Sequence, residues 1–507
     1  MPAAPKLPMT QHLHTHQRAH AAVPEPVRGR APLPLLSFDE AARLTNYAWD
    51  AALGGFLRPA DILNRSARRL RTMIEFARSH TRLYRQRCRH LPPAGALSPS
   101  DLPPLTKREL MADLEASLTD PRLTRARIDA FIADPLRVGQ LLDNRYALWT
   151  SSGSTGEPAI FLHDREALAL YQALEMFRFR GLASPAQLAT RLLTGERYAM
   201  VAATGGHFAG VATIEHLRQS MPWLARSVRA ISLMQPLPAL VAQLNAFQPT
   251  LLASYPTAVE MLADEQQAGR LSLQLAEIWT GGETLAEPVR RRVQQVFGCR
   301  VRNAYGASEF LSIAWDCGHG NLHVNADWVL LEAVDANYRP VAPGTPSHTV
   351  LLSNLVNRAQ PLLRYDLGDS ITVLPEPCGC GSALPAIHVE GRCDDILRFP
   401  VRDAPDVQVL PLALATVLED DACVHDFQVV QCAQRKLQVR LGAGERRASE
   451  RVRAALAAFL RAQGTQRVVV DVTSGEPLRC PRSGKLRRVL YAPTLAPAVR
   501  PRRRALH

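Results

Sequence analysis

The residues most suited to chemistry begin with a loop at 150–158, which reads Thr-Ser-Ser-Gly-Ser-Thr-Gly-Glu-Pro. Five hydroxyl side chains and two glycines follow a predicted short strand at 146–149. Glycines allow close backbone approach, and hydroxyl and amide groups donate to phosphate oxygens, so this loop is suited to enclosing a triphosphate. It is not a Walker A loop, because no Gly-Lys-Ser/Thr follows. A plain Ser/Gly linker has a similar composition, and the loop alone does not decide between the two.

A second segment, residues 303–309 (Asn-Ala-Tyr-Gly-Ala-Ser-Glu), places an aromatic ring, a hydroxyl and a carboxylate close together. Tyr305 can stack on a base, and Ser308 can reach a phosphate. Glu309 offers the oxygen ligands that Mg²⁺ prefers. The competing interpretation is a turn with a capping serine and an exposed glutamate.

Three later segments extend the pattern. Residues 364–369 (Arg-Tyr-Asp-Leu-Gly-Asp) offer a carboxylate that can accept from both hydroxyls of a ribose. Residues 391–395 (Gly-Arg-Cys-Asp-Asp) add a cation and an acidic turn, although both segments also have the composition of ordinary turns. Residues 481–488 contain Lys485, one of four lysines among 60 basic residues. A compact ammonium suits the neutralisation of a single developing oxyanion, whereas the alternative interpretation is a basic hairpin.

These segments need a scaffold that brings them together. Between about residues 146 and 395, apolar runs alternate with helical patterns, and buried strands are predicted at 200–204, 251–254 and 277–280. This alternation predicts an α/β fold, with a large N-terminal domain of mixed and parallel sheets covered by helices. Strand-like stretches at 321–375 indicate a smaller β unit.

The expected domain organisation has four parts. Residues 1–36 form a loose leader and 37–394 the large domain, which opens with helical spacing over 38–90. Residues 395–490 form a small mobile α+β lid domain, with strands at 428–432 and 467–472 and a helix at 447–463. Residues 491–507 form a basic tail.

Composition narrows the class of protein. Hydrophobic residues make up 47% of the chain, which is enough for a buried core and argues against general disorder. The net charge of +13 comes from dispersed arginines without an aromatic-interleaved stripe, so nucleic-acid binding is not favoured. The sequence contains no run of 18 or more apolar residues, so no membrane span is predicted. Nine cysteines, mostly scattered singly, indicate reduced thiols and a cytoplasmic protein.

One group of cysteines and histidines differs from the scattered thiols. Cys317, His319, His323, Cys378 and Cys380 can supply four nitrogen and sulfur ligands for a structural zinc ion, with His323 as the preferred fourth ligand. The Cys-x-Cys spacing is tighter than the usual Cys-x₂-Cys. Free thiols in loops are the alternative of equal weight.

Taken in order, the segments resemble the signature of the adenylate-forming superfamily, which comprises acyl-CoA synthetases, peptide-synthetase adenylation domains and luciferases. The order is the Ser/Thr/Gly loop, Gly281-Gly-Glu283, Tyr-Gly-x-Ser-Glu, Tyr-Asp-x-Gly-Asp, Gly-Arg-x-Asp-Asp and a C-terminal Gly-Lys. The resemblance spans roughly residues 146–490. Within the superfamily, the segments 79–84, 102–107, 317–332 and 378–381 are most similar to the branch of phenylacetate-CoA ligase and coenzyme F390 synthetase.

The resemblance implies a role for each motif. The loop residues would close on the β- and γ-phosphates of ATP, namely Ser151, Ser152, Gly153, Ser154, Thr155 and Gly156. Other residues would complete the nucleotide site, with Tyr305 stacking on adenine, Ser308 touching the α-phosphate, Glu309 binding Mg²⁺, Asp369 holding the ribose, Arg392 supporting the ribose or phosphate, and Gly282, Glu283 and Gly306 beside them. Lys485 would bridge the carboxylate and the α-phosphate, and Asp394 would be the hinge of the C-terminal lobe. The acyl pocket would be lined by His207, Phe208, Tyr255 and Gly281.

Two positions depart from the family pattern. Ala159 stands where many members have a lysine after the loop proline, and Ser308 stands where threonine is more common. Hydroxyl and backbone donors are retained at both places, but the missing lysine leaves the phosphate site short of one cation.

The implied function is ATP-dependent activation of a small carboxylic acid to an acyl-adenylate, with release of pyrophosphate. The acyl group would then pass to a thiol, with CoA as the expected acceptor and an aryl or arylacetic acid as the expected substrate. One alternative delivers the acyl group to a carrier protein or an amine, or performs AMP-linked chemistry on a cofactor. A different class, a non-catalytic nucleotide- or nucleic-acid-binding regulator, is the second alternative. No membrane partner is expected, and the oligomeric state stays open, a dimer being one option.

Overall fold

The computed structural model describes residues 38–54, 57–151, 159–180, 195–390, 396–401, 404–475, 477 and 488–492. Residues Leu36–His507 form one compact unit, distinct from Met1–Leu35. The predicted junction of the large domain with the lid, residues 391–395, lies outside the described residues. The proposed division at 394/395 therefore stays a prediction.

The described part of the chain begins with three helices in the region where helical spacing was predicted: α1 (Phe38–Gly54), α2 (Pro59–His80) and α3 (Arg82–Arg87). One face of α2 is buried, and its side chains Leu70, Met73 and Ile74 belong to an apolar cluster. Two short helices follow, α4 (Lys107–Ala112) and α5 (Arg125–Ile132). Helix α4 begins at a capping box in which Thr106 and Glu109 bond each other's backbone amides.

A mixed nine-stranded sheet forms the centre of the unit, in the order β13-β14-β9-β8-β7-β6-β5-β3-β4. The five strands from β4 to β7 in this order run parallel to one another, and the remaining pairings are antiparallel. The bounds of the parallel strands are β3 (Tyr198–Ala202), β4 (Val228–Ser232), β5 (Leu251–Ser254), β6 (Glu277–Gly281) and β7 (Arg300–Ala307). The antiparallel strands are β8 (Phe310–Asp316), β9 (Leu322–Val324), β13 (Ser370–Val373) and β14 (Ala386–Glu390).

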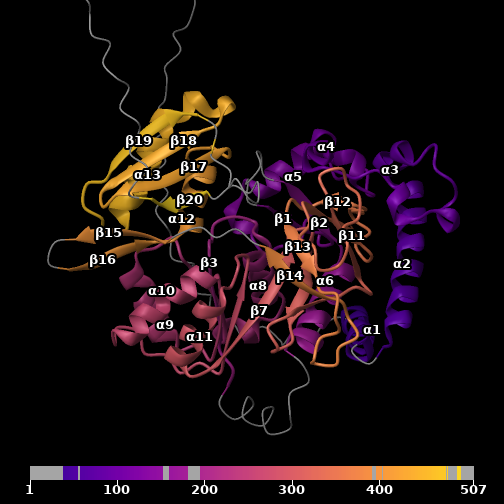
Figure 1. Cartoon of the computed structure of the whole chain (residues 1–507), viewed down its shortest axis with the longest axis horizontal. Helices are drawn as coiled ribbons and strands as arrows, with labels where there is room; N and C mark the ends of the chain where they lie inside the picture. The colour runs from indigo at the N-terminus through magenta and orange to yellow at the C-terminus, as the bar shows by residue number, and fades with distance from the viewer. Residues whose placement is uncertain are drawn as a thin grey trace, which may run out of the picture. The chain divides into compact units, whose positions relative to one another are not determined.

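Helices cover the parallel strands, as the alternating pattern predicts. Three of them, α9 (Leu237–Phe247), α10 (Pro256–Gln267) and α11 (Glu287–Phe297), lie together on one face (Figure 1). Side chains such as Leu244 and Leu262 pack there against Leu252 of β5. The opposite face of β5 and β6 packs against Phe179 of the π-helical turn η5 (Glu175–Phe179). Burial on both faces explains why these strands read as continuous apolar runs.

Next to the sheet, a hairpin is formed by β1 (Ala147–Thr150) and β2 (Ile160–His163), which pair antiparallel. It is followed by α6 (Arg165–Leu174), and α8 (Ala209–Ser220) follows β3. Tyr171 and Leu174 of α6 share a core with Trp149 of β1 and Phe310 of β8. The hairpin is thereby fixed against the antiparallel part of the large sheet.

The region predicted as a smaller β unit divides between two sheets. Strands β10 (Val329–Val334), β11 (Thr349–Asn354) and β12 (Tyr365–Asp366) form a separate three-stranded sheet. Strands β9 and β13 come from the same stretch of sequence but pair with β14 in the large sheet. Residues that follow β12 therefore reach the edge of the nine-stranded sheet.

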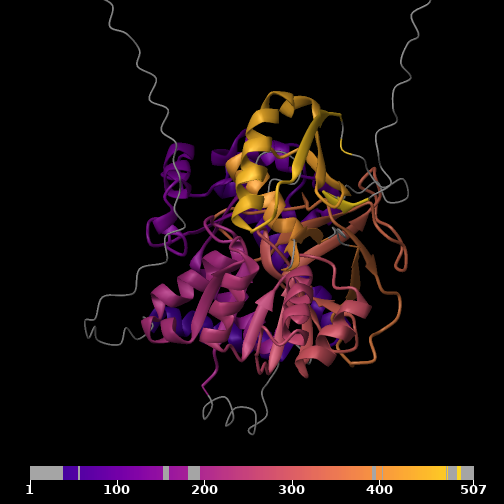
Figure 2. The same ribbon diagram turned by 90° about the vertical axis from the view of Figure 1, so that its left-hand side faces the viewer.

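The C-terminal part has two sheets of its own. A hairpin of β15 (Leu397–Val401) and β16 (Ala404–Val409) precedes α12 (Pro411–Thr416), and a four-stranded sheet has the order β19-β18-β17-β20. Its strands are β17 (Phe427–Ala433), β18 (Lys436–Leu441), β19 (Val469–Ser474) and β20 (Val489–Tyr491). Helix α13 (Ser449–Ala462) lies on this sheet (Figure 2) and buries Val452 and Leu456 against it. The predicted α+β character of this part is found in the structure.

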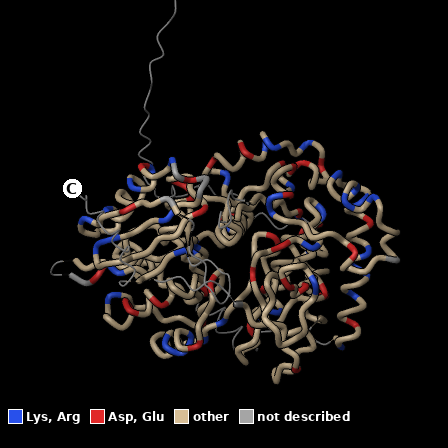
Figure 3. The backbone as a smooth tube through the Cα atoms, turned by 45° about the horizontal axis from the view of Figure 1, so that its top comes forward, with Lys and Arg blue, Asp and Glu red and all other residues tan. Residues whose placement is uncertain are grey.

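Charged residues are mixed in sign over the part of the chain that the structure describes. Figure 3 shows Lys and Arg interspersed with Asp and Glu along the helices and strands. Many of these residues form ion pairs, for example Arg82 with Asp113 and Arg125 with Asp129. The basic residues that give the chain its positive net charge are therefore interspersed with acidic residues, many of which pair with them.

Among the described residues, none of the helices combines the length and the apolar character that crossing a membrane requires.

Candidate active site

Seven of the predicted site residues follow the carboxyl ends of the parallel strands. Because β3, β5, β6 and β7 run parallel, these ends meet at one edge of the sheet, which is where open α/β sheets bind their ligands. The residues that follow these ends are His207 and Phe208 after β3, Tyr255 after β5, Gly282 and Glu283 after β6, and Ser308 and Glu309 after β7. Gly281, Tyr305 and Gly306 are the last residues before the same edge.

The base of the Ser/Thr/Gly loop lies at this edge. The Ser151 amide donates to the Ala159 carbonyl at 2.9 Å, and the Ala159 amide donates to Ser151 Oγ at 3.0 Å. The Ser308 hydroxyl donates to the Thr150 carbonyl at 3.4 Å. Two motifs that are about 150 residues apart in the sequence are therefore in contact. The loop residues Ser152, Gly153, Ser154, Thr155 and Gly156 lie outside the described residues.

The turn that carries Ser308 and Glu309 is held by both of its carbonyl oxygens. His163 Nε2 lies 2.8 Å from the Ser308 carbonyl, and Asn354 Nδ2 donates to the Glu309 carbonyl at 3.0 Å. Tyr171 joins the two, because its hydroxyl is 3.1 Å from both His163 Nδ1 and Asn354 Nδ2. Burial lowers the pKa of His163 to about 4, so the ring is neutral and donates from Nε2 to the carbonyl. This buried network fixes the turn through its backbone carbonyls.

Asp369 and Tyr305 form the next contact. The Tyr305 hydroxyl donates to Asp369 Oδ2 at 2.8 Å, which joins β7 to the residue just before β13. Burial and the charge of Asp369 raise the pKa of Tyr305 well above its ordinary value, so the phenol keeps its proton. The other carboxylate of this motif, Asp366, accepts hydrogen bonds from Tyr338 and from the Gly368 amide. Asp366 thus shapes the turn, while Asp369 faces the tyrosine of the site.

Glu309 is buried, and its carboxylate is hydrogen bonded to the Tyr365 hydroxyl. Burial raises the pKa of Glu309 to about 7, and the nearby charge of Asp369 adds to this effect, whereas the hydrogen bond from Tyr365 and the charge of Lys107 oppose it. A buried carboxylate beside a second carboxylate is stabilised by a bound cation. With oxygen ligands of this kind, the residues present fit Mg²⁺.

Lys107 is a residue near the site to which sequence analysis gave no role. It begins α4 and is half-buried, and its charge acts on Glu309. Two residues earlier, Leu105 pairs with Tyr365 in an isolated bridge, which brings this segment to the site. Ala159 is fully buried and supplies no cation at the position where the resemblance predicts a lysine. The rarity of lysine in this chain, which supported the role of Lys485, is the signal that could also have indicated Lys107.

Two glycines of the motifs are required by close contacts. A Cβ atom on Gly306 would lie 2.0 Å from the Leu311 carbonyl oxygen. Gly282 has a φ of +78°, and a Cβ there would lie 3.0 Å from the Tyr255 ring. The glycines of these motifs therefore let the backbone approach its neighbours at the site edge.

Glu283 has a structural contact within this edge. Its carboxylate accepts from the Thr257 amide at 3.1 Å and from the Thr257 hydroxyl at 2.8 Å. Thr257 is in the first turn of α10, where backbone amides lack helical partners, so Glu283 caps this helix. The cap joins the loop after β6 to the helix after β5.

The residues predicted for the acyl pocket are partly aromatic and partly buried. His207 is 2% exposed, its ring lies 5.3 Å from that of Phe131, and its Nε2 atom has no hydrogen-bond partner. Burial lowers the pKa of His207, so the ring is neutral. Phe208 is half-buried and precedes α8, and Tyr255 contacts Gly282. The structure places Gly282 and Tyr255 together, with Gly281 at the end of β6 and with His207 and Phe208 after the neighbouring strand.

The residues predicted for the mobile part of the reaction are not described. Arg392, Asp394 and Lys485 lie outside the described residues, so their roles stay predictions. The predicted metal ligands Cys317, His323, Cys378 and Cys380 are brought together, and His319 is not among the four.

A sheet whose carboxyl edge gathers the base of a hydroxyl-rich loop and paired tyrosines and carboxylates is consistent with a nucleotide-binding α/β protein. Comparison with known proteins makes the class specific. Residues 63–336, more than half of the chain, match the family described as AMP-binding enzyme, and the chain belongs to this family. The predicted membership of the adenylate-forming superfamily is confirmed.

Two curated proteins are similar in part. The phenylacetate-coenzyme A ligase of Thermus thermophilus is 29% identical over 189 residues, which cover 34% of this chain and 41% of that protein. Protein CapK of Staphylococcus aureus is 26% identical over 133 residues, covering 26% of this chain and 28% of that protein. The chain thus matches less than half of the length of either relative.

Among solved structures, the fold is similar to that of 2-hydroxyisobutyryl-CoA ligase in complex with 2-HIB-AMP and CoA. The TM-score is 0.56 at 18% identity, over 87% of this chain and 91% of that chain. The predicted α/β fold is confirmed by this likeness.

Proposed function

We propose that the protein activates a carboxylic acid with ATP, forming an acyl-adenylate and pyrophosphate, and then transfers the acyl group to the thiol of CoA. The observation that carries this proposal is the convergence of three contacts at one sheet edge. These contacts are Ser308 with Thr150, Tyr305 with Asp369, and Tyr365 with Glu309. Each joins motifs that are distant in sequence, and together they leave hydroxyl and carboxylate groups on the side where ATP would bind.

In the first step, an oxygen of the substrate carboxylate attacks the α-phosphorus of ATP, a new oxygen–phosphorus bond forms, and the bond to pyrophosphate breaks. Asp369 would hold the ribose, and Ser308 would donate to the α-phosphate. Lys485 would stabilise the charge that develops on the phosphoryl oxygens. Mg²⁺ held by Glu309 would neutralise phosphate charge.

In the second step, the thiolate of CoA attacks the acyl carbon, a thioester forms, and AMP leaves. The rotation of the C-terminal lobe about Asp394 would separate this step from the first. The resemblance to acyl-CoA synthetases supports this order of events.

We further propose an aryl or arylacetic acid as the substrate. The support is the aromatic lining around the ends of β3 and β5, where Phe208 and Tyr255 accompany a buried, neutral His207. An apolar ring is suited to such surroundings, and a single polar atom such as His207 Nε2 can orient it. The similarity to a phenylacetate-coenzyme A ligase agrees with this choice.

The acceptor is tested by supplying purified protein with ATP, Mg²⁺ and a free carboxylic acid that the protein adenylates. CoA, a phosphopantetheinyl carrier protein or an amine is then added in separate reactions. Mass spectrometry of the products is expected to show an acyl-CoA thioester and stoichiometric AMP. Acyl transfer to the carrier protein or the amine, without thioester formation on CoA, would replace CoA as the acceptor. The absence of AMP formation with every acid would favour a non-catalytic regulator.

A further inference from the structure

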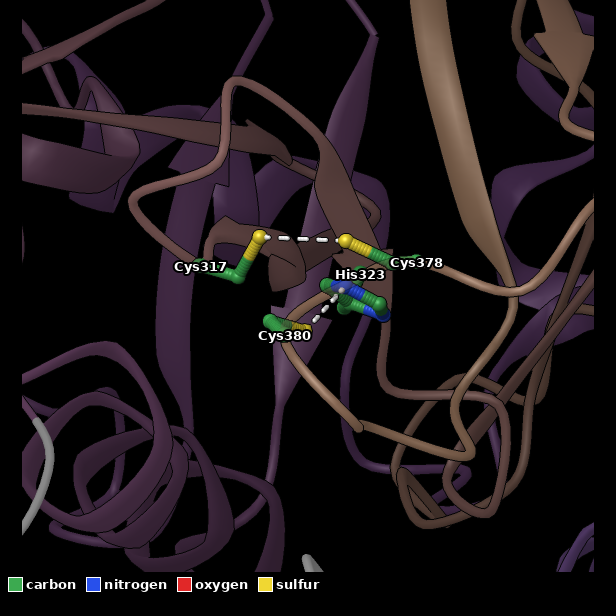
Figure 4. Close-up of side chains that lie close together, drawn as sticks. All are labelled: Cys317, His323, Cys378 and Cys380. Atoms are coloured by element: carbon green, nitrogen blue, oxygen red, sulfur yellow. Dashed lines mark hydrogen bonds between the residues drawn. The ribbon is translucent and has the colours of Figure 1, made fainter.

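Four side chains with metal-binding atoms lie close together outside the nucleotide motifs. This cysteine–histidine cluster consists of Cys317, His323, Cys378 and Cys380 (Figure 4), and its ligand atoms all lie within 4.8 Å of one another. Cys317 Sγ is 3.7 Å from Cys378 Sγ, and Cys380 Sγ is 3.2 Å from His323 Nε2. Tetrahedral zinc with its usual bond lengths separates two sulfur ligands by about 3.8 Å and a sulfur and a nitrogen ligand by about 3.6 Å. The Cys317–Cys378 separation agrees with this arrangement, and the Cys380–His323 separation is about 0.4 Å shorter.

The cluster joins two separate connections of the large sheet. Cys317 follows β8 and His323 lies in β9, whereas Cys378 and Cys380 lie between β13 and β14. His323 is opposite Ala386 in the pairing of β9 with β14, so the sheet itself fixes His323 relative to the loop that carries Cys378 and Cys380. Ligands from two chain segments far apart in sequence are typical of sites that tie a fold together.

Hydrogen bonds orient the ligand atoms as in metal centres. His323 is fully buried, and its Nδ1 lies 2.8 Å from the Leu384 carbonyl, so Nδ1 carries the proton and Nε2 offers its lone pair toward the cluster. Asn321 Nδ2 donates to Cys378 Sγ at 3.3 Å, and the Ser382 amide donates to Cys380 Sγ at 3.4 Å. Donors of this kind stabilise a thiolate, which is the form of cysteine that binds metal.

We propose that this cluster binds one Zn²⁺ ion as a structural Cys₃His site. Three thiolates and one imidazole complete a tetrahedron, which leaves no open position for a substrate or water, and soft sulfur ligands select zinc over magnesium. The ion fastens the β8–β9 connection to the β13–β14 connection.

If the protein has the proposed function, the zinc ion also stabilises the nucleotide site indirectly, through the strands that carry its residues. Strand β8 continues from the turn that carries Glu309, and β13 begins directly after Asp369. Loss of the ion therefore lowers thermal stability first, and weakens ATP binding only through the loosened hairpins.

Elemental analysis of the full-length protein, produced in zinc-supplemented medium and purified without metal-affinity resin, tests the proposal. We expect about one zinc ion per chain. The double variant C378S/C380S is expected to lose the zinc and to melt at a lower temperature. The matched control C299S/C432S, which removes two half-buried cysteines outside the cluster, is expected to keep both the metal and the wild-type melting temperature.

If the double variant fails to fold, the wild-type protein still decides the question. Replacement of zinc by Co²⁺ is expected to give the intense charge-transfer absorption of a tetrahedral site with three thiolates. A zinc content near zero, a cobalt spectrum without thiolate bands, or a Cys317–Cys378 disulfide in the freshly purified protein would each overturn the proposal. These measurements do not depend on adenylation, so failure of the zinc site and failure of the proposed function are distinguishable.

Discussion

At the scale of single residues, two carboxylates of the site, Asp369 and Glu309, are each matched by a buried tyrosine. Tyr305 donates to Asp369 at 2.8 Å, and Tyr365 is hydrogen bonded to Glu309. A carboxylate held by a fixed donor needs less reorganisation when a ligand binds, which contributes to affinity. The tyrosines therefore act through the carboxylates that they position.

The first prediction concerns Tyr305→Phe. This change removes the donor to Asp369 but keeps the ring that would stack on adenine. Because a hydrogen bond to a charged group contributes about 1.5–3 kcal/mol, the KM for ATP is expected to rise by roughly 10- to 100-fold, with a smaller effect on kcat. Steady-state kinetics over a range of ATP concentrations measures the change.

Tyr338→Phe is the matched control, because it removes a similar bond, from the Tyr338 hydroxyl to Asp366 at 2.9 Å. The control is expected to leave the KM for ATP unchanged. An equal rise in both variants would show that Tyr305 has only a general role in packing.

The residues proposed to carry chemistry are predicted from the sequence, whereas the residues that hold them in place are not. Asp369, Ser308 and Glu309 lie in short motifs whose residue types and order can be recognised directly. His163 and Asn354, which hold the Ser308–Glu309 turn, come from segments that no spacing rule connects with it. Only the folded chain brings such partners together.

At the scale of secondary-structure elements, a buried ion pair connects η5 with the segment before β10. Arg178 donates to Asp327 through two bonds of 2.7 and 2.8 Å, and the two side chains are 2% and 0% exposed. Arg178 also donates to the Ala51 carbonyl of α1 and to Asn325. One guanidinium therefore joins three parts of the chain.

The second prediction is that Arg178→Met lowers the free energy of unfolding by about 3–5 kcal/mol, because it leaves the Asp327 carboxylate buried and without its main partner. Urea denaturation at pH 7 measures this loss. Arg82→Met serves as the control, since the Arg82–Asp113 pair is 58% and 53% exposed and an exposed pair contributes about 0–1 kcal/mol. Similar losses in both variants would contradict the importance of the buried pair.

The Arg178–Asp327 pair also predicts how the free energy of unfolding depends on pH. Desolvation alone would raise the pKa of Asp327, but the hydrogen bond and charge of Arg178 outweigh it and lower the pKa below 3.8. The contribution of Asp327 to stability is therefore complete above that value and is lost as the pH falls through the lower pKa of the folded state. The difference in stability between wild type and Arg178→Met is expected to narrow in acid.

Local patterns predicted the elements better than their pairing. The strand predicted at 251–254 coincides with β5, and the helix predicted at 447–463 contains α13. The sequence did not indicate that β9 and β13 would pair in the large sheet while β10, β11 and β12 form a separate one, because strand pairing depends on contacts between distant segments. The position of β13 in the large sheet brings Asp369 to Tyr305.

At the scale of the whole molecule, the two half-reactions would be divided between two arrangements of the chain. The small C-terminal lobe would bring Lys485 to the nucleotide for adenylation and withdraw it for thioester formation. The resemblance to the adenylate-forming superfamily supports this division. The lobe consists of a four-stranded sheet covered by α13, and these elements share a hydrophobic core of their own.

The third prediction follows from this division of labour. Lys485→Ala is expected to lower the rate of acyl-adenylate formation by about 10²-fold or more, because one charge-stabilising contact in the transition state is lost. The variant should still convert a preformed acyl-adenylate and CoA to the thioester at close to the wild-type rate. Loss of both half-reactions, or of neither, would contradict the role given to Lys485.

The central claim, activation of an acid by ATP, is tested most directly by exchange of labelled pyrophosphate into ATP over a panel of carboxylic acids. We predict exchange that requires an acid, is fastest with an aryl or arylacetic acid, and falls sharply in Lys485→Ala. A protein that binds ATP but supports no exchange with any acid, or equal exchange without one, would contradict the account.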